Sequence, residues 1–222
     1  MLNGQVHTIF ATPMFVSTFH DRKKLDDILN FVKSLEYRDK NGQTENKMSS
    51  NTFVLDLPEL NELKNYVEDA LKYFMYSVIQ TEQSLKITQS WVNYSEKGKA
   101  HTFHTHSNSI FSGVFYLQSD LDSPNVMFFN RAPNQYQFES GGDTPFTGNM
   151  FRCNPDPGSL IIFPSNLPHA VETNMSDTPR ISLSFNTFVK DKVGSMSELT
   201  YAGACQTFTF AIYFCSISLQ ST

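Results

Sequence analysis

Residues 104–117 read HTHSNSIFSGVFYL, in which two histidines one residue apart precede a run of apolar and aromatic side chains. On a β-strand, residues two apart point to the same face, so His104 and His106 would present two imidazole rings side by side. Imidazole is a good ligand for iron, copper, nickel and zinc. The stretch therefore predicts a metal-binding strand, and a polar loop that is merely rich in His and Thr is the alternative interpretation.

His169 is the candidate for a third metal ligand. It follows LIIFP at residues 160–164, an apolar run that is typical of a buried strand. Two histidines from one strand and a third from another would together form one face of a metal site. We predict that His104, His106 and His169 converge on one side of a β-barrel.

Arg180 and Ser182 form a second candidate site in the sequence RISLSFN, residues 180–186. On a strand the two side chains share a face. A guanidinium group beside a hydroxyl suits a carboxylate, because Arg supplies paired donors. An ordinary exposed Arg is the alternative, and the interpretation gains weight from the nearby candidate ligand His169.

Apolar residues recur at helical spacing in the first part of the chain. This periodicity predicts helices over residues 21–38 and from about residue 58 to 82. Residues 39–51 between them predict a polar loop. The apolar, β-branched residues 5–19 predict an edge strand or arm.

From residue 86 onward the sequence changes to short alternating stretches separated by Gly, Pro, Asn and Asp. Many short strands with frequent turns predict a sandwich or barrel, and helices that precede them predict a helical layer on one side of a β core. The predicted strands are 87–94, 100–106, 110–118, 125–130, 147–152, 158–164, 168–173 and 180–189.

Composition narrows the classes of function. The chain has 222 residues with 20 Phe and 9 Tyr, a bias toward strands, and a net charge of −5 that gives no reason to expect nucleic-acid binding. The odd count of 3 Cys, without a C-x-x-C pair, predicts a reduced, cytoplasmic chain. Its first residues lack the charged start and long apolar run that are typical of a signal peptide, and no apolar stretch reaches the roughly 20 residues that a membrane span needs.

Five segments, taken in order, carry a resemblance to a known family. They are WVN at 91–93, HTHSNSIFSGVFYL at 104–117, PGSLIIFPS at 157–165, His169, and RISLSFN at 180–186. Together they resemble a 2-oxoglutarate/iron(II) oxygenase family that is found in phages and marine bacteria. The resemblance covers about residues 86–189 and extends more weakly to the N-terminal arm and helices.

The resemblance implies a mostly β fold: a double-stranded β-helix, or jelly-roll, cupin-like barrel, with N-terminal helices packed on one side. It also implies Fe(II) and 2-oxoglutarate as cofactors, and O₂ and an unknown primary substrate as partners. His104 would be the first iron ligand, His106 would stand where the wider superfamily has Asp or Glu, and His169 would be the distal ligand. Arg180 with Ser182 would bind 2-oxoglutarate. A phage-encoded enzyme of this kind would act in the host cytoplasm.

The organisation expected from these observations is one domain over residues 1–189, with a β-helix core at about 86–189. Residues 190–222 form a C-terminal extension of unknown role, whose apolar end could pair with a second copy in a homodimer. The long loop at 131–146 is a candidate mobile cover over the active site, with an ordinary surface insertion as the alternative.

Three further polar residues, Asn93, Asn108 and Tyr116, are candidates for contacts to the cosubstrate or substrate. Hydrogen bonding within a strand face or a turn is the alternative for each. Two functions compete with the oxygenase: a cupin-like, three-histidine metal dioxygenase that does not use 2-oxoglutarate, and a non-catalytic jelly-roll module for binding or structure.

Overall fold

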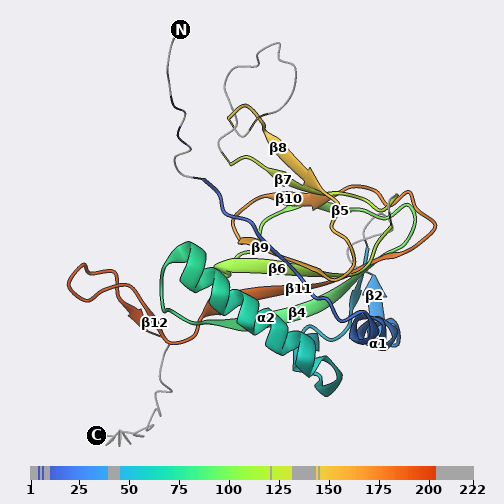
Figure 1. The fold of residues 1–222 in the computed structure, drawn as a ribbon, viewed down its shortest axis with the longest axis horizontal. Coiled ribbons are helices and arrows are strands. Elements are labelled where there is room, and N and C mark those ends of the chain that lie inside the picture. Colours follow the sequence, from blue (N-terminus) through green and yellow to red (C-terminus); the bar gives the residue numbers. More distant parts are fainter. Residues whose placement is uncertain are drawn as a thin grey trace, which may run out of the picture.

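The computed structural model describes residues 5, 7, 11–39, 46–120, 122–131, 144 and 146–203. Within them, a large and a small β-sheet face each other, and two helices cover the outer side of the large sheet (Figure 1). The large sheet has seven strands in the order β1-β9-β6-β11-β4-β3-β2. Its strands are β1 (Phe15–Thr18), β2 (Tyr37–Asp39), β3 (Lys47–Ser49), β4 (Leu85–Ser95), β6 (Phe111–Gln118), β9 (Ser159–Pro164) and β11 (Arg180–Val189).

The small sheet has four strands in the order β5-β10-β7-β8. Every pairing in the two sheets is antiparallel, and the chain crosses between the sheets repeatedly, which gives the double-stranded β-helix that the resemblance implied. The strands of the small sheet are β5 (His101–His104), β7 (Val126–Phe129), β8 (Met150–Cys153) and β10 (His169–Val171).

Side-chain alternation along β11 explains why one sheet serves both the core and a polar cavity. Ile181, Leu183 and Phe185 point to the outer face of the large sheet and join the main hydrophobic cluster with the helices. The intervening Arg180, Ser182 and Ser184 face the small sheet and line a cavity. The apolar and polar residues of this sequence therefore sort to opposite faces with a period of two.

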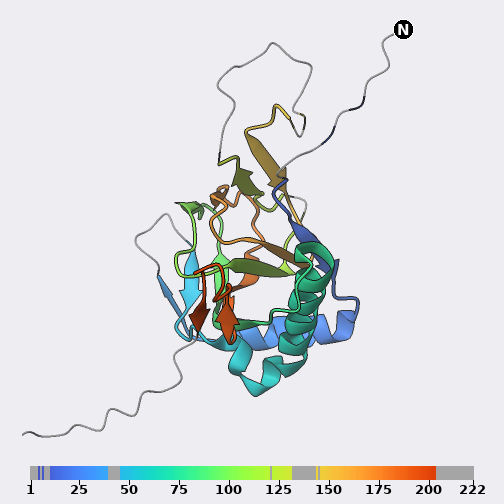
Figure 2. The ribbon, with the colours of Figure 1, turned by 90° about the vertical axis from the view of Figure 1, so that its left-hand side faces the viewer.

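Both helices bury one face against the large sheet (Figure 2). Helix α1 (Arg22–Lys33) begins after Asp21, whose carboxylate accepts a hydrogen bond from the backbone N–H of Lys24 at 3.0 Å. Helix α2 (Asn61–Phe74) follows the short turns η1 (Val54–Asp56) and η2 (Pro58–Leu60) and continues as the π-helical η3 (Met75–Ile79). It ends at Gln80, whose left-handed backbone has φ 58°. The buried residues of α1 and α2 are Leu25, Ile28, Val32, Leu63, Val67, Ala70, Leu71 and Phe74.

Two predictions for the N-terminal part of the chain were wrong, one at a helix boundary and one in missing a strand. The first helix ends at Lys33 instead of residue 38. The predicted loop at 39–51 contains β3, which pairs with β4 and extends the large sheet, while residues 40–45 lie outside the described part of the chain. A three-residue strand is too short to display an alternating pattern, so only its partner reveals it.

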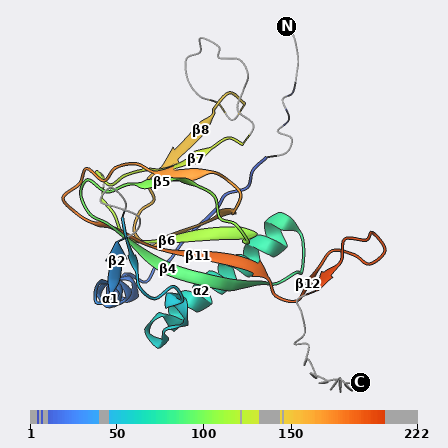
Figure 3. The same ribbon diagram turned by 180° about the vertical axis from the view of Figure 1, so that it is seen from behind.

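The start of the C-terminal extension forms a two-stranded hairpin, β12 (Lys192–Val193) with β13 (Ala202–Gly203), which projects from one end of the sheets (Figure 3). Residues 204–222, on which the suggestion of a homodimer rested, lie outside the described residues. No helix in the described part of the chain combines the length and the apolar character that crossing a bilayer requires.

Gly113 on β6 lies directly opposite Phe185 on β11, and a Cβ at this position would overlap the Phe185 ring. We therefore expect Gly113→Ala to lower the free energy of unfolding by about 1–3 kcal/mol, the usual cost of overpacking a core. Urea unfolding of the purified protein measures the change. Shortening the facing ring with Phe185→Leu should relieve the overlap, so the double variant should be more stable than the sum of the two single changes predicts. Strict additivity would contradict this explanation.

Candidate functional site

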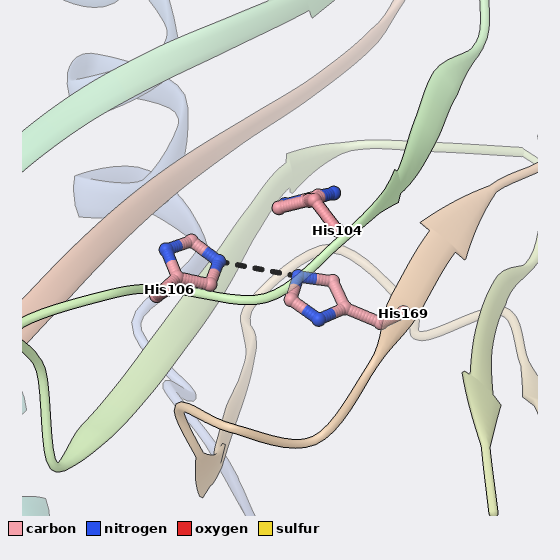
Figure 4. A group of neighbouring side chains, drawn as sticks. All are labelled: His104, His106 and His169. Atoms are coloured by element: carbon pink, nitrogen blue, oxygen red, sulfur yellow. Dashed lines mark hydrogen bonds between the residues drawn. The ribbon is translucent and has the colours of Figure 1, made fainter. Parts of the chain in front are cut away.

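Three histidines come together at the edge of the small sheet (Figure 4). One nitrogen from each of His104, His106 and His169 lies within 4.8 Å of those of the other two. His104 ends β5 and pairs directly with His169, the first residue of β10. The convergence predicted from the sequence is therefore present, and these three rings could hold a metal ion.

His106 reaches the group by a different route from the one predicted. Strand β5 ends at His104, so His106 lies in the following turn and not on the strand. Its backbone N–H donates to the carbonyl of Ser165 at 2.9 Å, which anchors the turn beside β9. Its ring lies parallel to that of His169, with Nε2 of each 3.2 Å apart, and stacks on Trp91 at 6.0 Å between centroids.

Backbone carbonyls fix which nitrogen two of the rings offer. Nδ1 of His104 lies 2.7 Å from the carbonyl of Thr102, and Nδ1 of His169 lies 3.0 Å from the carbonyl of Leu167. A carbonyl only accepts, so Nδ1 carries the proton in both rings and the Nε2 lone pair is left for a metal. Histidines that bind metals commonly have their other nitrogen held in this way.

Burial keeps His169 in the neutral form that binds metals. Its side chain is only 5% exposed, and this desolvation, followed by the charge of His104, lowers its pKa to about 4, although the bond to Leu167 opposes the shift. The pKa of an ordinary histidine is near 6.5, so this lowered pKa keeps His169 neutral throughout the physiological range.

This depressed pKa predicts how the stability of the protein depends on pH when a chelator removes metal. Below pH 6.5 the unfolded chain protonates His169 while the folded chain does not, so stability falls between about pH 6.5 and pH 4. The full contribution is about 3 kcal/mol at 1.36 kcal/mol for each pKa unit. Urea unfolding across this pH range should show that the free energy of unfolding falls less for His169→Gln than for the wild type. An equal dependence on pH in the two proteins would contradict the prediction.

Arg180 is a buried cation that has no anionic partner among the described residues. It is 4% exposed, its guanidinium group lies 4.9 Å from the centre of the Tyr116 ring, and its Nη1 lies 3.4 Å from the Ser182 hydroxyl. Its Nε is buried without any hydrogen-bond partner. A buried charge is costly unless it is paired, so this arrangement suits an anionic ligand that supplies the missing acceptor.

Arg180 and the three histidines line one cavity between the two sheets. Ser182 and Tyr116 lie beside Arg180 in its wall, and burial raises the pKa of Tyr116 to about 12 against the opposing charge of Arg180, so its phenol stays protonated. No Asp or Glu is among the described residues that line this cavity. Its side chains therefore provide neutral ligands and a positive charge, and the negative charge must come from what binds there.

The structure does not place the other candidates, Asn93, Asn108 and the loop at 131–146, as free ligand contacts in the cavity. Asn93 lines the cavity, but its amide is held by Asn46 at 3.0 Å and Ser184 at 2.9 Å. Asn108 is exposed, is not among the residues that line the cavity, and has a left-handed backbone with φ 56°. That conformation favours Asn in turns, which accounts for the residue without a ligand. The candidate cover at 131–146 falls largely on residues 132–143 and 145, which are outside the described residues.

Sequence reasoning missed Asn46. It lies in the segment predicted to be a loop, yet it is buried and lines the cavity. Nothing in its local sequence distinguishes it from the polar residues around it, because its position depends on the pairing of β3 with β4.

Comparison with known families finds one match, over residues 89–186, to the family described as "Putative 2OG-Fe(II) oxygenase". The matched segment contains all three histidines, Arg180 and Ser182. No protein with a curated description matches the sequence.

Several solved structures share the fold at low sequence identity. An oxidoreductase of the 2OG-Fe(II) oxygenase family from Burkholderia pseudomallei is 15% identical with a TM-score of 0.59, covering 78% of this chain and 83% of its own. HygX from Streptomyces hygroscopicus, solved with nickel, 2-oxoglutarate and hygromycin B, is 12% identical with a TM-score of 0.57, covering 79% and 82%. A Pseudomonas putida prolyl-4-hydroxylase is 12% identical with a TM-score of 0.55, covering 79% and 93%.

These similarities support the fold, while the family match supports the class of protein. Over residues 89–186 this chain is similar to enzymes of the 2OG-Fe(II) oxygenase family, and it shares the double-stranded β-helix with the solved structures.

Proposed function

We propose that this protein is a 2-oxoglutarate- and iron(II)-dependent oxygenase in which His104, His106 and His169 hold the iron and Arg180 with Ser182 binds 2-oxoglutarate. The observation that carries the proposal is the buried, anion-free guanidinium of Arg180 in the same cavity as the histidine group. An ordinary exposed Arg, the alternative left by the sequence, would not need a ligand.

The two parts of the cavity suit the two ends of 2-oxoglutarate. The far carboxylate would accept hydrogen bonds from Arg180, including one from the unpaired Nε, and from the Ser182 hydroxyl. The other end, with its keto and carboxylate oxygens, would bind the metal. Tyr116 supports the guanidinium group from one face and stays neutral, so it adds no competing negative charge.

Charge favours the same ligand. Three imidazoles bring no negative charge to a metal, in contrast to the Asp or Glu of the wider superfamily, and the described cavity wall has no carboxylate to replace it. A dianionic cosubstrate would compensate both the ion and Arg180. We therefore expect 2-oxoglutarate and iron to bind more tightly together than separately.

When bound, iron(II), 2-oxoglutarate and O₂ supply the oxidising power, with conversion of 2-oxoglutarate to succinate and CO₂ coupled to oxidation of the primary substrate. The chain's own residues hold and orient these groups. The carbonyls of Thr102 and Leu167 fix the ring tautomers, and the apolar side chains of Val114, Val126 and Phe163 in the cavity wall limit access of water.

HygX, which shares this fold, was solved with nickel and 2-oxoglutarate bound, which supports the assignment of the cosubstrate by analogy. The cupin-like alternative uses the same histidines without 2-oxoglutarate and leaves the buried Arg180 without a function.

Anaerobic titration of the purified protein with iron(II) and then 2-oxoglutarate tests the proposal. We expect a weak visible charge-transfer band that requires both, and that succinate, which lacks the keto group, does not produce. Iron binding without this band would favour the cupin-like dioxygenase. Absence of iron binding would exclude both metal-dependent functions.

A further inference from the structure

Asn46, the residue before β3, lines the cavity and carries a buried hydrogen-bond acceptor that is unused. Its side chain is only 2% exposed and lines the same cavity as the histidines and Arg180. Its Nδ2 donates to the carbonyl of Lys47 at 3.2 Å and to Oδ1 of Asn93 at 3.0 Å. Its Oδ1 is buried and has no hydrogen-bond partner.

The neighbours of Asn46 determine which of its two amide atoms is unpaired. The Lys47 carbonyl can only accept, so the atom that faces it must be the NH₂ group. Asn93 in turn donates to the Ser184 hydroxyl at 2.9 Å, which leaves its oxygen facing Asn46. Rotating the Asn46 amide by 180° would place oxygen against oxygen at both contacts. The oxygen is therefore the atom left without a partner.

An unpaired amide oxygen does not by itself mark a ligand site. Asn154 also has a buried Oδ1 without a partner, but it donates to the carbonyls of Asp120 and Ser123 and is not among the residues that line the cavity. Asn46 differs because it is one of the residues that line the cavity, and its amide bonds to Asn93, another lining residue. The comparison also makes Asn154 a matched control.

2-Oxoglutarate cannot satisfy this acceptor. At neutral pH it is a dianion whose oxygens all accept hydrogen bonds, so none of them could pair with Asn46 Oδ1. The complementary group must carry an N–H or O–H. A cationic donor is disfavoured, because Arg180 and a bound metal already make the cavity positive.

Building on the function proposed above, we propose that Asn46 determines specificity by accepting a hydrogen bond from a hydroxyl or amide N–H of the primary substrate. The substrate class is a neutral or anionic compound that carries such a donor. Sites that pair with a substrate donor discriminate strongly against analogues that lack it, because their own polar group is then buried unpaired. Asn93 and Ser184 act as positioning residues that hold the Asn46 amide in this orientation.

Matched pairs of small probes test this assignment by ligand-observed NMR on protein loaded with zinc(II) and 2-oxoglutarate. The pairs are benzyl alcohol with benzyl methyl ether, and benzamide with N,N-dimethylbenzamide, which differ in the donor. We expect the wild type to bind the member that carries the donor, benzyl alcohol or benzamide, about 3- to 10-fold more tightly than its methylated counterpart, which is the usual contribution of one hydrogen bond. Asn46→Ala should abolish this preference and leave binding of the methylated probes unchanged, whereas Asn154→Ala should retain it.

Equal binding of both members of each pair by the wild type, including failure of all probes to bind, would overturn the role of Asn46. So would a preference that survives in Asn46→Ala. The wild-type measurement decides the question even if Asn46→Ala does not fold. Binding of 2-oxoglutarate is followed in the same samples, so its absence from the wild type would identify a failure of the proposed function itself.

Discussion

Replacing Arg180 by methionine is expected to weaken 2-oxoglutarate binding by roughly 30- to 4,000-fold while iron binding remains. The estimate follows from the cost of about 2–5 kcal/mol for truncating one partner of a buried, hydrogen-bonded charge pair, at 1.4 kcal/mol for each factor of ten. Methionine fills a similar length of the site without charge or donors. Isothermal titration calorimetry of the metal-loaded protein with 2-oxoglutarate measures the effect.

The thermal stability of Arg180→Met should not fall along with its affinity for 2-oxoglutarate. The free protein buries the Arg180 charge without an anionic partner among the described residues, so Arg180→Met should unfold at the same temperature as the wild type or a higher one. Addition of 2-oxoglutarate should then raise the unfolding temperature of the wild type but not of the variant. This pattern separates loss of a ligand contact from loss of the fold.

Arg152→Met provides the matched control, since Arg152 is an exposed residue of β8 that pairs with Glu172 at 3.1 Å. It should leave 2-oxoglutarate binding unchanged, because an exposed ion pair contributes little. If Arg180→Met bound 2-oxoglutarate as tightly as the wild type, Arg180 would lose its proposed role and the cupin-like dioxygenase would become the better interpretation.

Removing one imidazole from the histidine group is expected to have the second large effect. His169→Ala should lower iron(II) affinity by at least about 100-fold, more than the roughly 10- to 100-fold that loss of a residue supporting a metal ligand costs. His169 is the most buried of the three, and its Nε2 is held toward the group by the bond from Nδ1 to the Leu167 carbonyl. Metal analysis after anaerobic equilibration with iron(II) reports the loss.

Two variants define what this result means. His20→Ala removes an exposed histidine outside the cavity and should bind iron as the wild type does. His106→Asp replaces the imidazole by the carboxylate that the wider superfamily has at this position and should retain iron. Normal iron content in His169→Ala would remove His169 from the metal site, and loss of iron in His20→Ala would show that the assay reports adventitious binding.

Much of the fold could be predicted because its signals are local. Strand phase placed Arg180 and Ser182 on one face before any partner strand was known, and the structure puts that face of β11 in the cavity. The apolar residues of α1, which recur at helical spacing, also predicted that helix, although their pattern did not reveal that it ends at Lys33. Strand β3 was not predictable, since three residues cannot show a period and its existence depends on pairing with β4.

The candidate site divides in the same way. The identities of His104, His106, His169, Arg180 and Ser182 came from the sequence, because residue type and strand phase are properties of short segments. The sequence could not place His106 beyond the end of β5, nor show that Asn108 faces solvent, because both depend on where a strand ends and turns.

The sequence by itself determined the chemistry available to this protein: three imidazoles, a guanidinium and a hydroxyl distributed over strands of a β-helix. Only the tertiary structure decided which polar atoms remain without partners. Whether Arg180 Nε or Asn46 Oδ1 is satisfied depends on groups from strands far apart in the chain, and hydrogen bonds are short and directional, so no local pattern encodes the result. These unpaired atoms, more than the residue types, indicate what the cavity binds.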